Sequence, residues 1–148
     1  MTPCFDPGLI VDALATALAE ESLAVAIYEV GTAQDLAKAR AARSPIAVLV
    51  FNERTQVANG QFTDTIGLLL ELRDATPDDG QTRLTRMRDL REAVFDALDG
   101  ARLDTDWEPL RYVGGRLFDL GDETSARLAW LEYYETGRGK TQIGRAHV

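Results

Sequence analysis

Residues that carry catalytic or metal-binding chemistry are scarce in this chain of 148 residues. It contains one histidine, His147, and one cysteine, Cys4. A lone cysteine rules out an internal disulfide and any multi-cysteine metal site. A lone histidine near the end leaves acid–base, nucleophilic and zinc schemes without their usual participant. We therefore expect no catalytic centre, cofactor or metal, and we expect Cys4 to lie in a loose N-terminal segment.

Long apolar runs and an excess of basic residues are also missing. No uncharged apolar run is long enough to span a membrane. No basic segment precedes an apolar one near the N-terminus, as it does in a signal peptide, which predicts a cytoplasmic protein. The 16 Lys and Arg residues against 24 Asp and Glu give a formal net charge of −8. That charge opposes sequence-independent binding to nucleic-acid phosphates.

What the chain does contain is the composition of one globular domain, with 45% hydrophobic and 27% charged residues. Near the N-terminus, Asp6 is placed to cap a helix with Pro7 at its first position. Apolar residues then recur at helical spacing as far as Leu18. Residues 23–30 are rich in strand formers. The Ala-rich run 32–43 favours a short, peripheral helix.

A long hairpin is predicted in the middle of the chain. Residues 46–57 begin with an apolar section typical of a strand buried on both faces, and then turn polar. Asn59-Gly60 is the strongest short-range hairpin signal. The return strand, 61–75, alternates apolar and polar residues. Because both arms outrun their apolar halves, we expect the tip to stand out from the body.

The second half of the chain predicts one long helix and two strands. The helix stops at Gly100, a polar loop with Asp104 and Asp106 follows, and the strands cover 110–120 and 125–135. The apolar face of the helix comprises Leu84, Met87, Leu90, Val94, Ala97 and Leu98. The α-β-(α)-β-β-α-β-β order predicts an α+β fold with a mixed or antiparallel sheet, two main helices on one face of it and a long protruding hairpin.

Small groups of carboxylates are the remaining candidates for chemistry. Asp104 and Asp106 form one group, and Asp119, Asp122 and Glu123 form another. Oxygen ligands of this kind can hold a hard cation, but neither group has the spacing of a calcium loop. We interpret both as solvated turn residues.

Two features of the last strands are open to more than one interpretation. Gly114-Gly115 lacks the surroundings of a phosphate-binding loop, so a bulge or a close backbone approach explains it better. Strand alternation places Trp130 and Tyr134 on one face and Tyr133 on the other. These aromatic residues belong either to the core of the sheet or to an interface.

Four arginines decorate the long helix of the second half, and two of them, Arg83 and Arg86, are candidates for a partner-facing strip. Together with Arg88 and Arg91 they could meet an acidic partner. Acidic residues interleave with them along the helix, so the same pattern is typical of a solvated face held by intrahelical ion pairs. Both interpretations remain open at this point.

Five segments of the chain resemble the tail terminator, or tail completion, proteins of long-tailed, Mu-like phages and prophages. They are LIVDALATALAE (9–20), SPIAVLVF (44–51), the hairpin around Asn59-Gly60, LTRMRDLREAVFDALDG (84–100) and LAWLEYYETGRG (128–139). The resemblance implies a structural virion protein without a cofactor. Such a protein forms a ring, typically a hexamer, that caps the head-proximal end of the tail tube and ends tube polymerisation. The implied partners are other copies of itself, the tube protein and the head-side connector.

The hairpin tip and one exposed aromatic are the expected subunit interface. The candidate residues are Asn52, Glu53, Arg54, Asn59, Gly60, Phe62 and Tyr133. Alternative functions are a head–tail connector or neck protein and, from a different class, a small cytosolic α+β enzyme or ligand-binding domain. An enzyme needs an acid–base group in a pocket, and this sequence shows none.

The C-terminal residues have a separate interpretation. Residues 143–148 (IGRAHV) followed by a stop match the translation of a common sequencing adapter, ATC GGA AGA GCA CAC GTC TGA, and Gln142 fits the preceding codon. We expect one domain over residues 1–141, with residues 142–148 as adapter read-through without structure.

Overall fold

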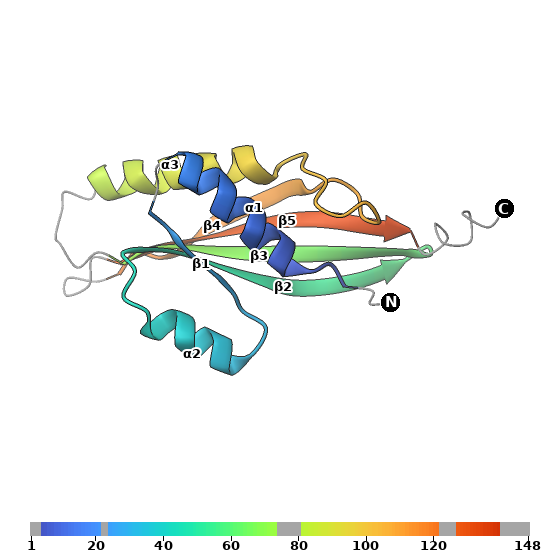
Figure 1. Cartoon of the computed structure of the whole chain (residues 1–148), viewed down its shortest axis with the longest axis horizontal. Coiled ribbons are helices and arrows are strands. Elements are labelled where there is room, and N and C mark those ends of the chain that lie inside the picture. The colour runs from blue at the N-terminus through green and yellow to red at the C-terminus, as the bar shows by residue number, and fades with distance from the viewer. Residues whose placement is uncertain (1–3, 22–23, 74–80, 122–126, 140–148) are drawn as a thin grey trace.

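The computed structural model describes residues 4–21, 24–73, 81–121 and 127–139. These residues form three helices and one five-stranded sheet with strand order β1-β2-β3-β5-β4 (Figure 1). The helices are α1 (Pro7–Glu20), α2 (Ala33–Ala41) and α3 (Gln81–Leu98). The strands are β1 (Ala26–Glu29), β2 (Ile46–Ala58), β3 (Gln61–Leu72), β4 (Arg111–Asp119) and β5 (Leu128–Gly139). The predicted α+β fold and element order are confirmed.

The sheet is mixed because β1 is parallel to β2, whereas the other neighbouring strands are antiparallel. Parallel neighbours cannot be joined by a tight turn and need a crossover segment. The helix α2 supplies that crossover on the face opposite α1 and α3. It is as short as predicted, with only Ala39 buried. The segment that contains α2 nevertheless connects the two parallel strands β1 and β2, so it is more than the peripheral addition that the sequence suggests.

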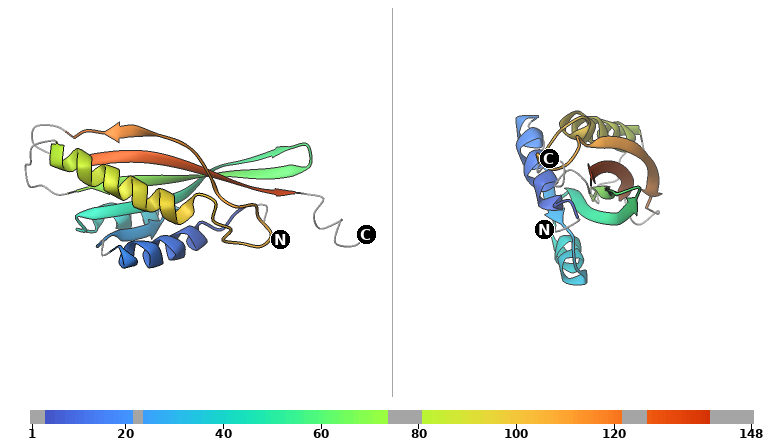
Figure 2. Two further views of the ribbon diagram at one scale, coloured as in Figure 1. Left: turned by 90° about the horizontal axis from the view of Figure 1, so that it is seen from above. Right: turned by 90° about the vertical axis from the view of Figure 1, so that its right-hand side faces the viewer.

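Helix α1 starts and packs as its sequence predicts. The Asp6 side chain accepts a hydrogen bond of 2.9 Å from the Gly8 backbone N–H, which satisfies a donor at the helix N-terminus. Ile10, Leu14 and Leu18 recur every four residues and are fully buried. This stripe packs on the sheet and against α3, so the two main helices share one face (Figure 2).

Strand alternation divides the buried residues between the two faces of the sheet. Val48 and Val50 of β2 meet α1 and α3 in the main core, together with alternate residues of β3. Ala47 and Leu49 point to the other face, where Ala39 of α2 covers them. The first half of β2 is therefore buried on both sides, as predicted. The base of the hairpin, residues 47–50 of β2, is therefore packed between the helices on the two faces of the sheet.

The turn that reverses the hairpin is set by its two residues. Asn59 and Gly60 have φ angles of 51° and 76°, the left-handed conformation that a two-residue type I′ turn requires at both central positions. Asparagine and glycine tolerate that region best. The register of β2 and β3 then runs without a break from Ala58 and Gln61 down to a bulge at Glu53.

One residue of the predicted helix face is not in the core. Leu84 is 45% exposed, whereas Met87, Leu90 and Val94 are buried. Leu84 lies in the first turn of α3, before the stretch that meets the sheet. The periodicity of the helix was predicted correctly, but a local pattern does not show where a helix first contacts the sheet.

Two expectations about the segments outside the regular elements were wrong. Phe5 and Trp107 are 2% and 4% exposed, and their rings meet edge-on with centroids 5.6 Å apart. The N-terminal segment is thus anchored from Phe5 onward, and the loop after α3 contains core residues. Single apolar anchors have no periodicity, which is why the sequence pattern gave no sign of them.

The last strand is longer than predicted and runs to Gly139 instead of Glu135. Its extra residues pair with β3 down to Gln61, opposite Gly139. On its other side, the Glu108 backbone N–H donates to the Gly137 carbonyl at 2.8 Å. Backbone partners on both sides outweigh the low strand propensity of glycine. Residues 142–148, where we expect no structure, lie outside the described residues.

Candidate functional site

The outer half of β2 is exposed, unlike the inner half of the same strand. Residues 53–58 of β2 are all exposed, although residues 47–50 of the same strand are buried. β1 pairs with β2 only along Ala47 to Val50. Beyond that point the outer edge of β2 has no strand neighbour among the residues that the structure describes. The hairpin extends past the helices (Figure 2), as the sequence predicts.

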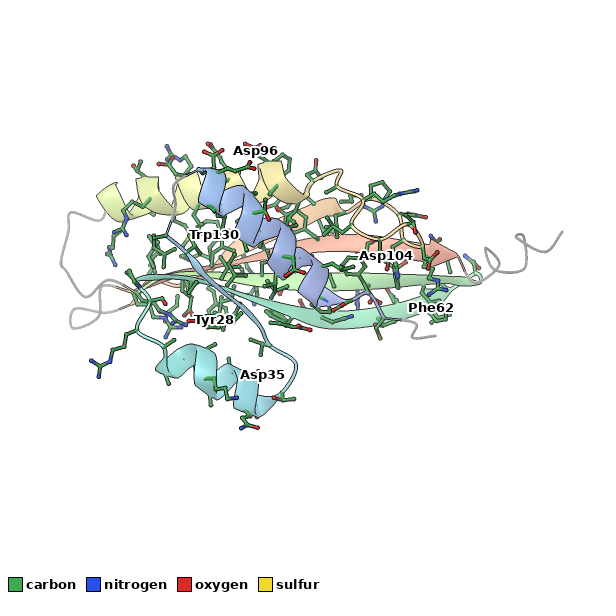
Figure 3. The ribbon with its side chains drawn as sticks, in the orientation of Figure 1. Tyr28, Asp35, Phe62, Asp96, Asp104 and Trp130 are labelled. Atoms are coloured by element: carbon green, nitrogen blue, oxygen red, sulfur yellow. The ribbon has the colours of Figure 1, made fainter. Side chains whose placement is uncertain are left out.

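The predicted interface residues do not all lie on that free surface. Glu53, Arg54 and Asn59 are exposed, and Gly60 is half-buried at the turn. Asn52 is half-buried and donates through Nδ2 to Asp64 at 2.8 Å. Phe62 is half-buried and packs against the main core (Figure 3). Asn52 and Phe62 therefore contribute to the fold as well.

Asp64 marks the border between the body and the outer hairpin, and sequence reasoning missed it. It is completely buried, and its Oδ2 accepts hydrogen bonds from the Phe5 backbone N–H at 2.5 Å and from Asn52. A buried carboxylate keeps its place only when such donors satisfy it. The residue thereby fastens the N-terminal segment to β3. Asp64 occupies the same face of β3 as Ile66 and Leu68, so strand alternation predicts that its side chain faces the core. This is the one sequence signal that could have identified it.

The aromatic residues of β5 separate as alternation predicts. Tyr134 is fully buried in the helix-covered core, and Trp130 packs against the same core with the Arg91 guanidinium 4.2 Å from its ring centroid. Tyr133 is half-buried on the opposite face. Burial raises the pKa of Tyr133, and hydrogen bonding to Glu53 raises it further. Of the two interpretations, core or interface, the structure shows that Trp130 and Tyr134 belong to the core.

A buried ion pair joins α3 to the last two strands. The Arg91 Nε donates to Glu132 Oε1 at 3.0 Å, and Glu132 is 2% exposed. Burial raises the pKa of Glu132, and the Arg91 charge partly opposes that rise. Part of a hollow of about 310 Å³ between α3 and β4 is lined by this pair and by Tyr112. Glu92 and Asp96 of α3 also line this hollow.

The two central glycines of β4 have the role that their sequence predicts. The register of β4 shifts between Tyr112 and Gly114, and Gly114 has a φ of 153°. A Cβ atom on Gly115 would overlap the carboxylate of Glu132. A bulge and a close approach are therefore both present. The glycine pair makes room for the buried ion pair.

The carboxylates of Asp104 and Asp119 make the local hydrogen bonds of turn residues. Asp104 Oδ1 accepts from the Asp106 backbone N–H at 2.9 Å, and Asp119 Oδ1 accepts from Gly121 at 2.8 Å. Within the described ranges no group of three or more His, Cys, Asp or Glu side chains could hold a metal ion. Asp122 and Glu123 of the second predicted group lie outside those ranges.

The arginines of α3 do not form one continuous strip. Arg91 turns inward to Glu132 and Trp130, and Arg88 is exposed beside the hollow. Arg83 and Arg86 are half-buried on the first two turns of the helix. A partner-facing role for Arg83 and Arg86 stays a prediction.

Sequence reasoning also missed the apolar surface of β4. Val113, Leu117, Phe118 and Leu120 are between 39% and 58% exposed. The bulges of this strand disturb its alternation, so a simple inside–outside pattern could not assign them. Together with the hairpin, this edge gives the molecule two exposed surfaces suited to contact with other proteins.

An α+β domain with a projecting hairpin and an exposed apolar strand edge has the features of an assembly protein. The family model for phage tail terminator proteins matches residues 1–142. The chain belongs to the phage tail terminator family and is therefore a structural component of a phage tail. No curated protein matches the chain. None of the helices in the described part is long and apolar enough to cross a membrane.

Proposed function

We propose that the protein caps the head-proximal end of a phage tail tube as a homo-oligomeric ring, a hexamer, in a long-tailed, Mu-like phage or prophage. The ring ends tube polymerisation and prepares the tail for joining to the head. The observation that carries the proposal is the exposed outer hairpin of a domain that matches the terminator family over residues 1–142. The tube protein and the head-side connector are the partners, and assembly takes place in the cytoplasm of the host.

The surface and charge of the domain support a ring. Two different strand edges are free among the described residues, and contacts between unlike surfaces repeat around a closed ring. The net charge of −8 repels phosphates, so a lumen lined by such subunits does not grip the passing genome. Specific nucleic-acid binding and membrane binding have no part in this proposal.

Native mass spectrometry and cross-linking over a wide range of concentrations test the ring. We expect a closed oligomer, either of the free protein or after addition of purified tail tubes, and electron micrographs should show it at one tube end. Monomers under every condition, with no binding to tubes, would contradict the proposal. Binding to isolated heads but not to tubes would instead assign a neck protein.

The role of the hairpin is tested by changing exposed residues only. The double substitution Arg54→Glu with Val57→Asp leaves Asn52, Asp64 and Phe62 in place. Since exposed positions contribute about 0.5 kcal/mol or less to stability, we expect an unchanged melting temperature and loss of assembly on tubes. A control with the same change of charge, Arg102→Glu with Thr105→Asp on exposed positions of the loop after α3, should assemble normally. Normal assembly of the hairpin variant would remove the hairpin from the interface.

A further inference from the structure

Three large apolar residues lie close in sequence at the end of β4. Leu117 is 39% exposed, Phe118 is 52% exposed, and Leu120, just past the strand, is 58% exposed. Phe118 shares a hollow within its own copy with Arg40, Arg73 and other charged residues, so it finds no apolar cover there. Exposed apolar clusters of this kind mark contact sites for other molecules. We call Leu117, Phe118 and Leu120 the β4 patch.

The backbone of β4 is poorly suited to pairing with another strand. Its register shifts twice, between Tyr112 and Gly114 and between Leu117 and Asp119. Such bulges twist an edge strand away from the flat geometry that edge-to-edge pairing needs. A partner of this edge is therefore recognised through the side chains of the β4 patch and not through a continuous ladder of hydrogen bonds.

An apolar groove lies at the other side of the sheet, under α2. It has a volume of about 420 Å³, and its floor is formed by Leu49, Phe51 and Leu69. Leu36 and Ala33 of α2 form its roof, and residues 30–32 close one end. The groove exists because α2 is short and rich in alanine, whose small side chains do not fill the space above the sheet. We call it the α2 groove.

The charges beside the two surfaces are complementary. The Arg116 guanidinium lies 5.8 Å from the ring centroid of Phe118 in the β4 patch. Beside the α2 groove, Asp35 accepts a hydrogen bond of 3.0 Å from the backbone N–H of Gly31, which lines the groove. That hydrogen bond lowers the pKa of Asp35 and keeps the carboxylate charged. A copy that brings its β4 patch to the groove thus brings a cation towards an anion.

We propose that the β4 patch of one copy inserts into the α2 groove of the next copy around the ring, so that Phe118 packs on Leu49, Phe51 and Leu69. This contact rests on the ring of the proposed function and specifies which surfaces build it. The patch belongs to the last strand in the sheet order and the groove to the first two strands. The two surfaces are therefore different, and their contact is head-to-tail, the arrangement that closes into rings.

Site-specific cross-linking tests the contact directly. In a Cys4→Ser background, one chain carries Leu120→Cys, which keeps Phe118 in place, and a second carries Ala33→Cys at the edge of the groove. We expect a short bis-maleimide to link the two chains when they are mixed with tail tubes, and neither chain to link with itself. The matched control is Leu84→Cys, an exposed leucine of α3, which should not link to Ala33→Cys. Rings on tubes without the link between positions 120 and 33 overturn this contact and leave the proposed ring in place. The absence of any ring overturns both.

Two blocking variants give an independent test. Phe118→Asp removes the apolar centre of the patch, and Ala33→Trp fills the groove from an exposed position without deleting a core side chain. Each variant alone should keep its melting temperature and lose ring assembly by at least tenfold in midpoint concentration. A mixture of the two variants retains one intact contact per pair, so it should stop at a heterodimer. Normal rings from either variant, or a symmetric dimer of the unchanged protein in which each copy's patch fills the other's groove, would contradict the head-to-tail contact.

Discussion

The inner and outer halves of the β2–β3 hairpin are made from the same two strands but have opposite surroundings. In the inner half, Val48 and Val50 face the helices and Leu49 faces α2, and all three are at most 2% exposed. In the outer half, residues 53–58 of β2 are exposed on both faces. The change occurs within a few residues, at the bulge beside Asn52 and at the buried Asp64. The inner half stabilises the domain, and the exposed outer half of β2 is free to contact other molecules.

The largest test of this comparison removes buried apolar volume from the inner half. Leu68→Ala empties a completely buried position against α1 and α3 and should cost about 2–5 kcal/mol of unfolding free energy. Val57→Ala shortens a side chain that is 52% exposed in the outer half and should cost less than about 0.5 kcal/mol. Urea unfolding measures both. Equal losses would show that the outer half is also part of the core.

A smaller loss is expected at the border between the halves. Asp64→Ala leaves the Phe5 backbone N–H buried without its acceptor, at a cost of about 1–3 kcal/mol. The N-terminal segment should then become accessible to protease. Asp12→Ala, at an exposed carboxylate on α1, is the control and should change neither stability nor cleavage. An Asp64→Ala variant as stable and protected as the unchanged protein would refute the anchoring role.

The buried Glu132 of β5, which lies opposite Leu68, gives the inner half a dependence on pH. The pKa of Glu132 in the fold is raised above its ordinary value of 4.5. A raised pKa means that the folded state binds the proton more tightly than the unfolded state. The stability from this group is complete below the unfolded pKa and is lost as pH rises through the folded pKa.

Glu132→Gln tests that sign. The stability of the unchanged protein relative to the variant should decline as pH rises from 4 to 7, with a slope of at most about 1.4 kcal/mol per pH unit. Chemical denaturation at a series of pH values measures it. A relative stability of the unchanged protein that rises with pH would mean that Arg91 lowers the pKa of Glu132 overall.

The smallest change in stability is expected at a buried hydroxyl that lacks a hydrogen-bond partner. The Tyr134 hydroxyl is buried opposite Ile66 and has no hydrogen-bond partner among the described residues, and burial raises its pKa. Tyr134→Phe removes an unsatisfied group and should stabilise the fold by up to about 1 kcal/mol. Calorimetry can detect this gain. A clear loss of stability would show that the hydroxyl has a partner after all.

The sequence by itself determined the elements whose signals are local. The cap at Asp6, the turn at Asn59-Gly60 and the stop at Gly100 each depend on the conformational preference of one or two residues. Alternation along β3 and β5 assigned the correct face to Leu68, Trp130 and Tyr133. The family resemblance, stated from five segments, agrees with the match over residues 1–142.

Tertiary structure alone decided the features that depend on distant partners. Trp107 is buried because Phe5 meets it across the molecule, and Gly137 is in a strand because Thr63 and Glu108 flank it. Glu132 is buried because α3 brings Arg91 over it. The β4 patch and the α2 groove likewise arise from how far the helices cover the sheet. Local sequence encodes φ, ψ and periodicity, whereas burial is decided by chain segments that meet only after folding.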